Sequence, residues 1–177
     1  MNTLMAASWA LFMASAWGEA PRVAVYESEA NYAQYQGLHQ MPLRTWLRER
    51  GQEFSVIGDE VAADPARLAD FAVVMTTSTY LIPREACDGL RKYLARGGCV
   101  VWIDSPSRCS DPSFRQTLGL GPNSTYAPMR SCRIAALVPN HPCAGTVEEI
   151  EAASLVGNPA LTATPDAQVL YEISGSL

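Results

Sequence analysis

The sequence predicts a three-layer, doubly wound α/β domain with a mostly parallel sheet. Short apolar strands alternate with amphipathic helices, and the joints between them are short, which is typical of strand–helix–strand units. Residues 99–103 are apolar throughout, as expected of a strand that is buried on both faces of a sheet. With 177 residues, 48% of them hydrophobic, the chain is long enough to build one core.

The N-terminal segment differs from the rest of the chain. Residues 1–18 carry no charged side chain, and the apolar run at residues 4–13 is too short to cross a bilayer. Small residues at Ala16 and Gly18 suit a signal peptidase. We therefore expect a signal peptide over residues 1–18 and a single domain over residues 19–177. The protein would be secreted or periplasmic, with no membrane attachment after cleavage; an uncleaved apolar anchor or a misassigned start codon is the alternative.

The first half of the domain is predicted to contain three strands. Leu43, Trp46 and Leu47 are spaced three and four residues apart, which marks one face of a helix between the first two strands. Residues 65–70 are predicted to form a short helix or a turn. The predicted strands are residues 22–26, 54–57 and 71–75.

The clearest helix signal in the sequence begins at Pro83. Proline suits the first turn of a helix, and Glu85 suits the positive end of the helix dipole. Gly97 and Gly98 predict its end, and the strand at residues 99–103 follows at once. The apolar face of this helix is formed by Cys87, Leu90, Tyr93 and Leu94.

Beyond residue 104 the predicted order loosens. Four prolines within residues 105–131 predict an irregular excursion. Further strands are predicted at residues 133–138 and 168–173. No helix signal follows the last strand, so a frayed terminus and the first part of a longer protein both remain open.

Cysteine spacing and net charge exclude several classes of function. No C-x-x-C pair is present, and the two histidines share no local motif with the five cysteines, so we expect no metal site and no other cofactor. A formal net charge of −5 without a basic stripe argues against nucleic-acid binding. In an oxidising compartment one disulfide is expected, either Cys109–Cys132 or Cys132–Cys143. Cys87 and Cys99 are predicted to be small buried hydrophobic residues.

One run of the chain resembles a known family. Residues 70–75 are an aspartate followed by an apolar strand; a helix, Gly97-Gly98 and a second apolar strand at 99–103 come next. This order is similar to the core of class I glutamine amidotransferase-like domains, which have a flavodoxin-like α/β fold. The likeness covers about residues 22–173 and is greatest to non-catalytic forms, such as the β-galactosidase trimerisation domain and trehalose-utilisation-like proteins. The Asn-His-Pro-Cys run at residues 140–143 resembles a His-Pro turn of these domains.

The resemblance also implies where a nucleophile would lie. Active members carry a cysteine at a sharp strand-to-helix elbow, completed by a histidine and a glutamate. The elbow falls here at Asp104 or Ser105, neither of which is a cysteine, and Pro106 replaces a glycine. Ser105 would need His39 or His141 as its base, and the Gly-x-Ser-x-Gly pattern of hydrolases is absent. Asp104, Ser105 and His141 are therefore only candidates for catalysis.

Polar residues follow the carboxyl ends of the predicted parallel strands, the edge at which open α/β sheets bind ligands. Carboxylates and hydroxyls grouped there would suit a sugar or a divalent cation, although strands also end in polar residues simply because loops are solvated. Glu29 and Tyr32 lie close to Glu27, in the stretch that follows the first predicted strand. The predicted ligand-binding residues are Glu27, Asp59, Thr76, Tyr80 and Asp104.

The sequence therefore favours an exported, non-catalytic domain for ligand binding or for assembly into a homo-oligomer. A link to carbohydrate metabolism, and with it a carbohydrate ligand, is implied by the resemblance alone. The alternative is a glycoside-type hydrolase that uses strand-end carboxylates such as Glu27 and Asp104. A nucleotide or phosphate binder is disfavoured, because no glycine-rich loop follows the first strand.

Overall fold

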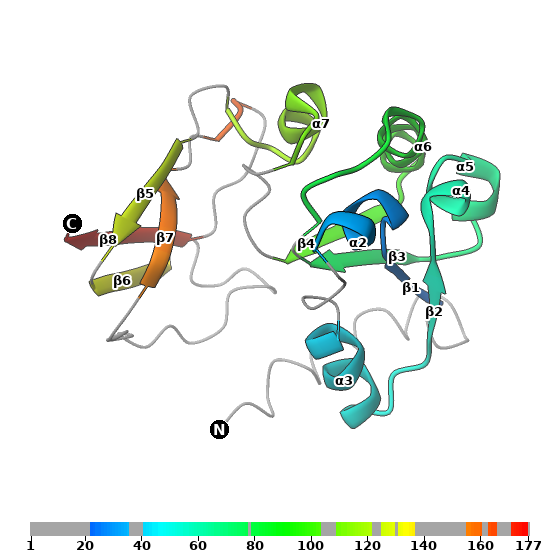
Figure 1. Cartoon of the computed structure of the whole chain (residues 1–177), viewed down its shortest axis with the longest axis horizontal. Helices are drawn as coiled ribbons and strands as arrows, with labels where there is room; N and C mark the ends of the chain where they lie inside the picture. The colour runs from blue at the N-terminus through cyan, green and yellow to red at the C-terminus, as the bar shows by residue number, and fades with distance from the viewer. Residues whose placement is uncertain are drawn as a thin grey trace. The chain divides into compact units, whose positions relative to one another are not determined.

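The described part of the chain forms two compact units, one comprising Pro21–Leu118 and the other containing Gly119–Leu177. Figure 1 shows the whole chain. In this computed structural model the described residues are 22–35, 41–77, 79–103, 109–121, 125–129, 131–136, 155–160, 163–165 and 171–176.

The N-terminal unit is built on a four-stranded parallel sheet in the order β2-β1-β3-β4. In register, Val25 of β1 pairs with Val56 of β2 on one side and Met75 of β3 on the other. The chain adds strands first on one side of β1 and then on the other, which places the topological switch point between β1 and β3. The strands are β1 (Val23–Tyr26), β2 (Phe54–Ile57), β3 (Val73–Thr77) and β4 (Cys99–Ile103).

Helices cover both faces of this sheet, which confirms the predicted three-layer α/β class. One face is covered by α3 (Met41–Glu49), and the other by α4 (Asp59–Ala62), α5 (Pro65–Leu68) and α6 (Arg84–Ala95) (Figure 1). Successive side chains along a strand point to opposite faces of the sheet, so they pack against different helical layers. Ala24 and Val74 pack in the core on the α4–α6 side, whereas Val25 packs against Leu43 and Leu47 of α3.

Glycine at position 89 allows α6 to approach α4 closely. A Cβ atom at Gly89 would overlap the backbone of Ala62 and Ala63, which lie at the end of α4. Leu90, Cys87 and Ala86 then bury the apolar face of α6 in the same core. The amphipathic pattern predicted for this helix therefore corresponds to its observed packing.

Three helices were not predicted as such. α2 (Glu29–Tyr35) occupies a tyrosine-rich polar stretch, and α4 follows β2 directly. α7 (Pro112–Thr117) lies within the predicted irregular excursion. Asp111 caps α7 by accepting from the N–H groups of Ser113 and Phe114, so Pro112 starts this helix rather than breaking a regular element.

The second unit contains two antiparallel strand pairs. β5 (Thr125–Met129) pairs with β7 (Leu155–Ala160), and β6 (Ser131–Ala136) pairs with β8 (Tyr171–Ser176). β6 and β8 overlap the strands predicted at residues 133–138 and 168–173, each offset by a few residues. Within the described residues, no helix is long and apolar enough to span a bilayer.

Candidate functional site

Four of the five residues predicted to bind a ligand belong to the described part of the chain. Glu27 follows β1, Asp59 begins α4 after β2, Thr76 is the last but one residue of β3, and Tyr80 lies beyond it. The remaining candidates, which lie outside the described residues, are Asp104, Ser105, His39 and His141.

Asp59 is a helix-capping residue that bridges two segments of the chain. Its Oδ1 accepts a hydrogen bond of 2.6 Å from the hydroxyl of Tyr26. Its Oδ2 accepts from the Ser28 hydroxyl at 3.3 Å and from the N–H groups of Glu29 at 3.1 Å and Ala30 at 3.4 Å. A carboxylate at this position satisfies N–H groups that an isolated α2 would leave unpaired. Burial and the Asp59 hydrogen bond raise the pKa of Tyr26 well above its ordinary value, so this phenol stays protonated.

Glu29 makes the reciprocal contact. Its Oε2 accepts a hydrogen bond of 2.6 Å from the N–H of Asp59, the first residue of α4. Gly58 makes room for this carboxylate, because a Cβ atom there would overlap the Glu29 carboxyl group. The starts of α2 and α4 are thus held together by two carboxylates.

Glu27 is neutralised within the fold. Both of its carboxylate oxygens accept hydrogen bonds from the guanidinium of Arg44 on α3. The Glu27 and Arg44 side chains are only 13% and 26% exposed, so the pair is largely shielded from water. A bidentate pair of this kind fixes both side chains and leaves Glu27 poorly placed to act as a general base.

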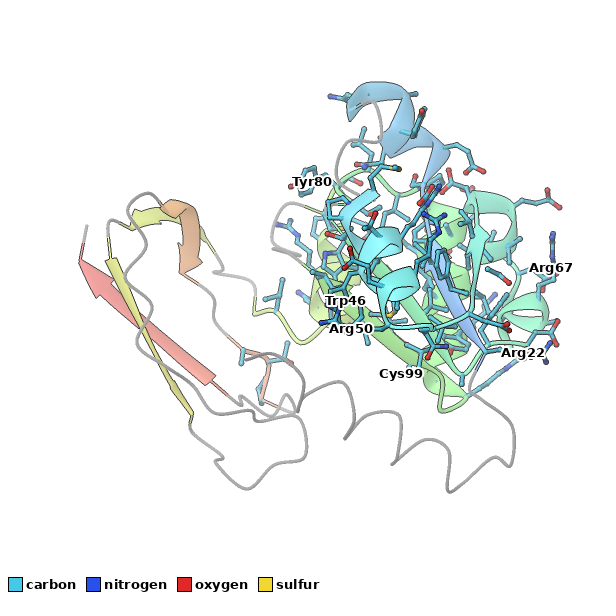
Figure 2. The ribbon with its side chains drawn as sticks, turned by 90° about the horizontal axis from the view of Figure 1, so that it is seen from below. Arg22, Trp46, Arg50, Arg67, Tyr80 and Cys99 are labelled. Carbon is cyan, nitrogen blue, oxygen red and sulfur yellow. The ribbon has the colours of Figure 1, made fainter. Side chains whose placement is uncertain are left out.

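Thr76 and Tyr80 belong to a buried polar group at the switch point between β1 and β3. The Thr76 hydroxyl donates to the carbonyl of Tyr26 at 3.0 Å and lies 2.5 Å from the Thr79 hydroxyl. Asn31 Oδ1 accepts from the N–H of Tyr80 at 2.9 Å. Figure 2 shows Tyr80 on the opposite side of the N-terminal unit from Arg67 of α5. These hydrogen bonds join the segment after β3 to α2, and they account for the polar side chains buried there.

A hollow of about 290 Å³ lies beside the carboxyl ends of β1 and β2. Of the four described residues that were predicted to bind a ligand, only Glu27 lines it. Glu29 and Tyr32 lie in the polar stretch after β1, which the sequence analysis had singled out. Val56 was not predicted to contribute, because nothing in the sequence distinguishes it from other strand residues. The full lining is Glu27, Glu29, Tyr32, Ala33, Val56, Ile57 and Gly58.

A second hollow, of about 450 Å³, lies between the start of α6 and the start of α7. Three of the charged groups that line it are paired with one another, because Arg91 contacts Asp88 at 2.5 Å and Asp111 at 3.2 Å. Hydrogen bonds from Ser113, together with the nearby Arg91, hold the pKa of Asp111 down at about 2. This network joins α6 to α7, and we assign it a structural role.

Cys87 and Cys109 are buried and are not arranged as nucleophiles, whereas Cys99, which the sequence predicted to be buried, is only partly buried. Burial raises the pKa of Cys87 to about 12 and also raises the pKa of Cys109, so both remain thiols at neutral pH. Cys109 forms no disulfide in this structure. The other two disulfide candidates are Cys132, which lies in β6, and Cys143, which is outside the described residues. Within the described chain, no group of three or more His, Cys, Asp or Glu residues is placed to hold a metal ion.

Comparison with known proteins bears on the fold. No family model and no curated protein matches the chain. A solved ThuA-like protein from Bacteroides uniformis is similar, with a TM-score of 0.53 and 17% identity over 86% of this chain and 67% of that one. A GMP synthase subunit from Thermoplasma acidophilum has a TM-score of 0.50 and 14% identity over 88% of this chain and 74% of that one. The chain has a glutamine amidotransferase-like fold.

At these identities the similarity extends to the fold and not to an activity. A β-galactosidase from Bifidobacterium adolescentis also aligns, with 15% identity over 88% of this chain and 77% of that one, but its TM-score of 0.42 supports no argument. In a glutamine amidotransferase-like fold the resemblance places the nucleophile elbow after β4, at Asp104 or Ser105. Those two residues lie outside the described part of the chain.

Proposed function

We propose that this protein is an exported, non-catalytic binding domain of the glutamine amidotransferase-like fold, and that its ligand site is the hollow beside β1 and β2. The observation that carries the proposal is the composition of that hollow, which combines exposed Tyr32 and Val56 with the carboxylate of Glu29. Ligand sites are concave and mostly apolar, with a few placed polar groups. The hollow also lies at the carboxyl edge of the sheet, where doubly wound folds bind ligands.

The absence of catalysis is supported by the state of two buried thiols and two described carboxylates, which are either protonated or already hydrogen-bonded. The sequence has no cysteine at the elbow position, and the buried thiols of Cys87 and Cys109 are held protonated. Glu27 is paired with Arg44 through both oxygens, and Asp59 accepts four hydrogen bonds from the end of β1 and the start of α2. A carboxylate occupied in this way would have to break its contacts before it could transfer a proton.

Binding is tested by calorimetric and thermal-shift screening of the purified chain against small amines, sugars and carboxylic acids. We expect at least one hit whose binding is lost in Glu29→Gln and Tyr32→Ala. Glu60→Gln and Trp46→Ala are the matched controls, because each removes an exposed side chain of the same kind away from the hollow. A ligand that binds all four variants equally well would place the site elsewhere and contradict the proposal.

The hydrolase alternative is tested with chromogenic glycosides. We expect no turnover above the uncatalysed rate. Turnover that is abolished by Glu27→Gln would instead establish a carboxylate-based hydrolase, and glutaminase activity would overturn the assignment of the elbow.

Export and assembly are separate parts of the proposal. Expression of the full chain in a bacterial host should give an extracytoplasmic product that lacks residues 1–18 by mass spectrometry. Light scattering of that product measures its oligomeric state. A carbohydrate ligand and a homo-oligomer rest on the family resemblance alone, and both remain predictions.

A further inference from the structure

The hollow beside β1 and β2 has two different walls. Glu29, Tyr32 and Ala33 are spaced three and four residues apart, so they share one face of α2 and form the first wall. The end of β2, from Val56 to Gly58, forms the second wall. The starts of α2 and α4 are locked together by the Glu29 and Asp59 carboxylates, which fixes the spacing between the walls.

Most of the surface that these walls offer is carbon. The Tyr32 side chain is 58% exposed and Val56 is 49% exposed, although both are large apolar residues. Val56 lies on β2, which is an edge strand of the four-stranded sheet. A ligand with an apolar body would remove this surface from water, which is the main source of affinity in small sites.

The charge of the hollow is negative and localised. Glu27 is neutralised by Arg44, so its charge is compensated inside the fold. Among the described residues Glu29 has no cationic partner. One of its oxygens accepts from the N–H of Asp59, and no described donor contacts the other. The described lining of the hollow contains no lysine or arginine. One uncompensated carboxylate therefore lies beside exposed aromatic and aliphatic carbon.

This composition discriminates between ligand classes. A sugar requires several hydrogen-bonding groups, whereas the side chains of the described lining offer two, the Glu29 oxygen that no described donor contacts and the Tyr32 hydroxyl. A divalent cation such as Ca²⁺ takes six to eight oxygen ligands, which these walls do not supply. An anion would be repelled by Glu29. An organic cation matches both features, because its charge meets the carboxylate while its carbon groups contact the ring and Val56.

We propose that the hollow binds a small organic ammonium compound, with Glu29 opposite the cationic nitrogen and with Tyr32 and Val56 against its carbon substituents. This inference rests on the proposed ligand site and names the chemical class of its ligand. The ring of Tyr32 contributes a cation–π contact in addition to apolar area.

The test uses choline as the probe, its neutral carbon isostere dimethylbutanol, and the anion dimethylbutyrate. Binding to the full chain is followed by calorimetry and by two-dimensional amide NMR. We expect choline to bind about two- to fivefold more tightly than the neutral isostere and the anion to show no binding, because contacts between exposed charges and rings contribute about 0.5–1 kcal/mol. Added salt should weaken choline binding, because Glu29 is exposed to solvent.

Variants locate the contact. Glu29→Gln should abolish the preference for choline over its isostere, and Tyr32→Leu should reduce it while keeping an apolar side chain. Glu60→Gln, which removes an exposed carboxylate on α4, should leave the preference unchanged. Amide spectra of each variant without ligand show whether it is folded.

The outcomes separate the two proposals. If choline and its isostere bind equally in the hollow, the ammonium class is wrong and the site stands. If choline binds but Glu29→Gln and Tyr32→Leu have no effect, the ligand lies elsewhere and both proposals fail. If no ammonium compound binds while another compound from the screen shifts the amides of residues 29–33 and 56–58, only the inference about the ligand class is overturned.

Discussion

Glu29 and Asp59 each cap the helix that the other begins. Asp59 accepts hydrogen bonds from the N–H of Glu29 at 3.1 Å, and Glu29 accepts from the N–H of Asp59 at 2.6 Å. The two residues are thirty positions apart in sequence. This reciprocal pair therefore joins the segment after β1 to the segment after β2, and it holds both walls of the candidate ligand site.

Removing the Asp59 carboxylate should cost more stability than removing an ordinary cap. Asp59→Ala deletes the acceptor of two helix N–H groups and of the buried Tyr26 hydroxyl, so we expect the free energy of unfolding to fall by about 2–3 kcal/mol. The matched control is Asp64→Ala, which removes only the cap of α5 and should cost about 1 kcal/mol. Urea denaturation measures both values. Equal losses in the two variants would show that the Tyr26 contact contributes nothing.

Glycine at position 89 is required by packing rather than by backbone conformation. Gly89→Ala places a methyl group against the backbone of Ala62 and Ala63, so we expect a loss of about 3 kcal/mol as α4 and α6 are forced apart. Gly51→Ala is the contrasting control, because its φ of +65° is unfavourable for alanine while its surroundings are open. That change should cost about 1 kcal/mol. Thermal unfolding ranks the two variants, and a harmless Gly89→Ala would contradict the close helix contact.

Asp111 should make the N-terminal unit sensitive to acid. Its pKa in the fold is about 2, below the ordinary value of 3.8, mainly because of the Ser113 hydrogen bonds. The charged form is favoured by folding, so its contribution is fully present above about pH 5 and is lost as the pH falls from about 4 to 2. Asp111→Asn keeps a capping oxygen but cannot titrate, so its stability should fall less steeply over this range. Urea midpoints at several pH values measure the difference.

A variant with a charge removed elsewhere is the control for that comparison. Glu60→Gln changes an exposed carboxylate and should follow the wild-type dependence on pH. If Asp111→Asn and the wild type lose stability in parallel between pH 5 and 2, the network of Arg91, Asp111 and Ser113 does not stabilise the charged carboxylate.

The parallel sheet and the longest helix were predicted correctly, because each is marked by a pattern within one short stretch of sequence. The apolar run at residues 99–103 and the amphipathic helix after Pro83 need no partner to be recognised. The helix α2 carries no apolar stripe, and part of its capping comes from Asp59, so propensity alone did not reveal it. α7 was missed because Pro112 was read as a breaker rather than as the first residue of a helix.

The candidate site was predictable only in its location. The rule for open α/β sheets indicated the carboxyl edge and therefore Glu27 and Asp59. The sequence could not show that Arg44, seventeen residues away, would neutralise Glu27, nor that Asp59 would be used as a cap. Val56 contributes through its exposure on an edge strand, which depends on strand order. Tertiary pairing thus decides which polar residues at an edge remain available to a ligand.

Cysteine reactivity gives a direct test of the non-catalytic assignment. The Cys87 side chain is completely buried, and burial raises its pKa to about 12, so almost no thiolate exists at pH 8. We expect iodoacetamide to leave Cys87 unmodified in the native chain over a time in which the unfolded chain is fully alkylated. Mass spectrometry of digested protein measures modification at each site, and the same chain in guanidinium chloride serves as its own control. Rapid alkylation of Cys87 in the native state would reveal an activated thiol, and an acyl-transfer activity through this residue would then have to be considered.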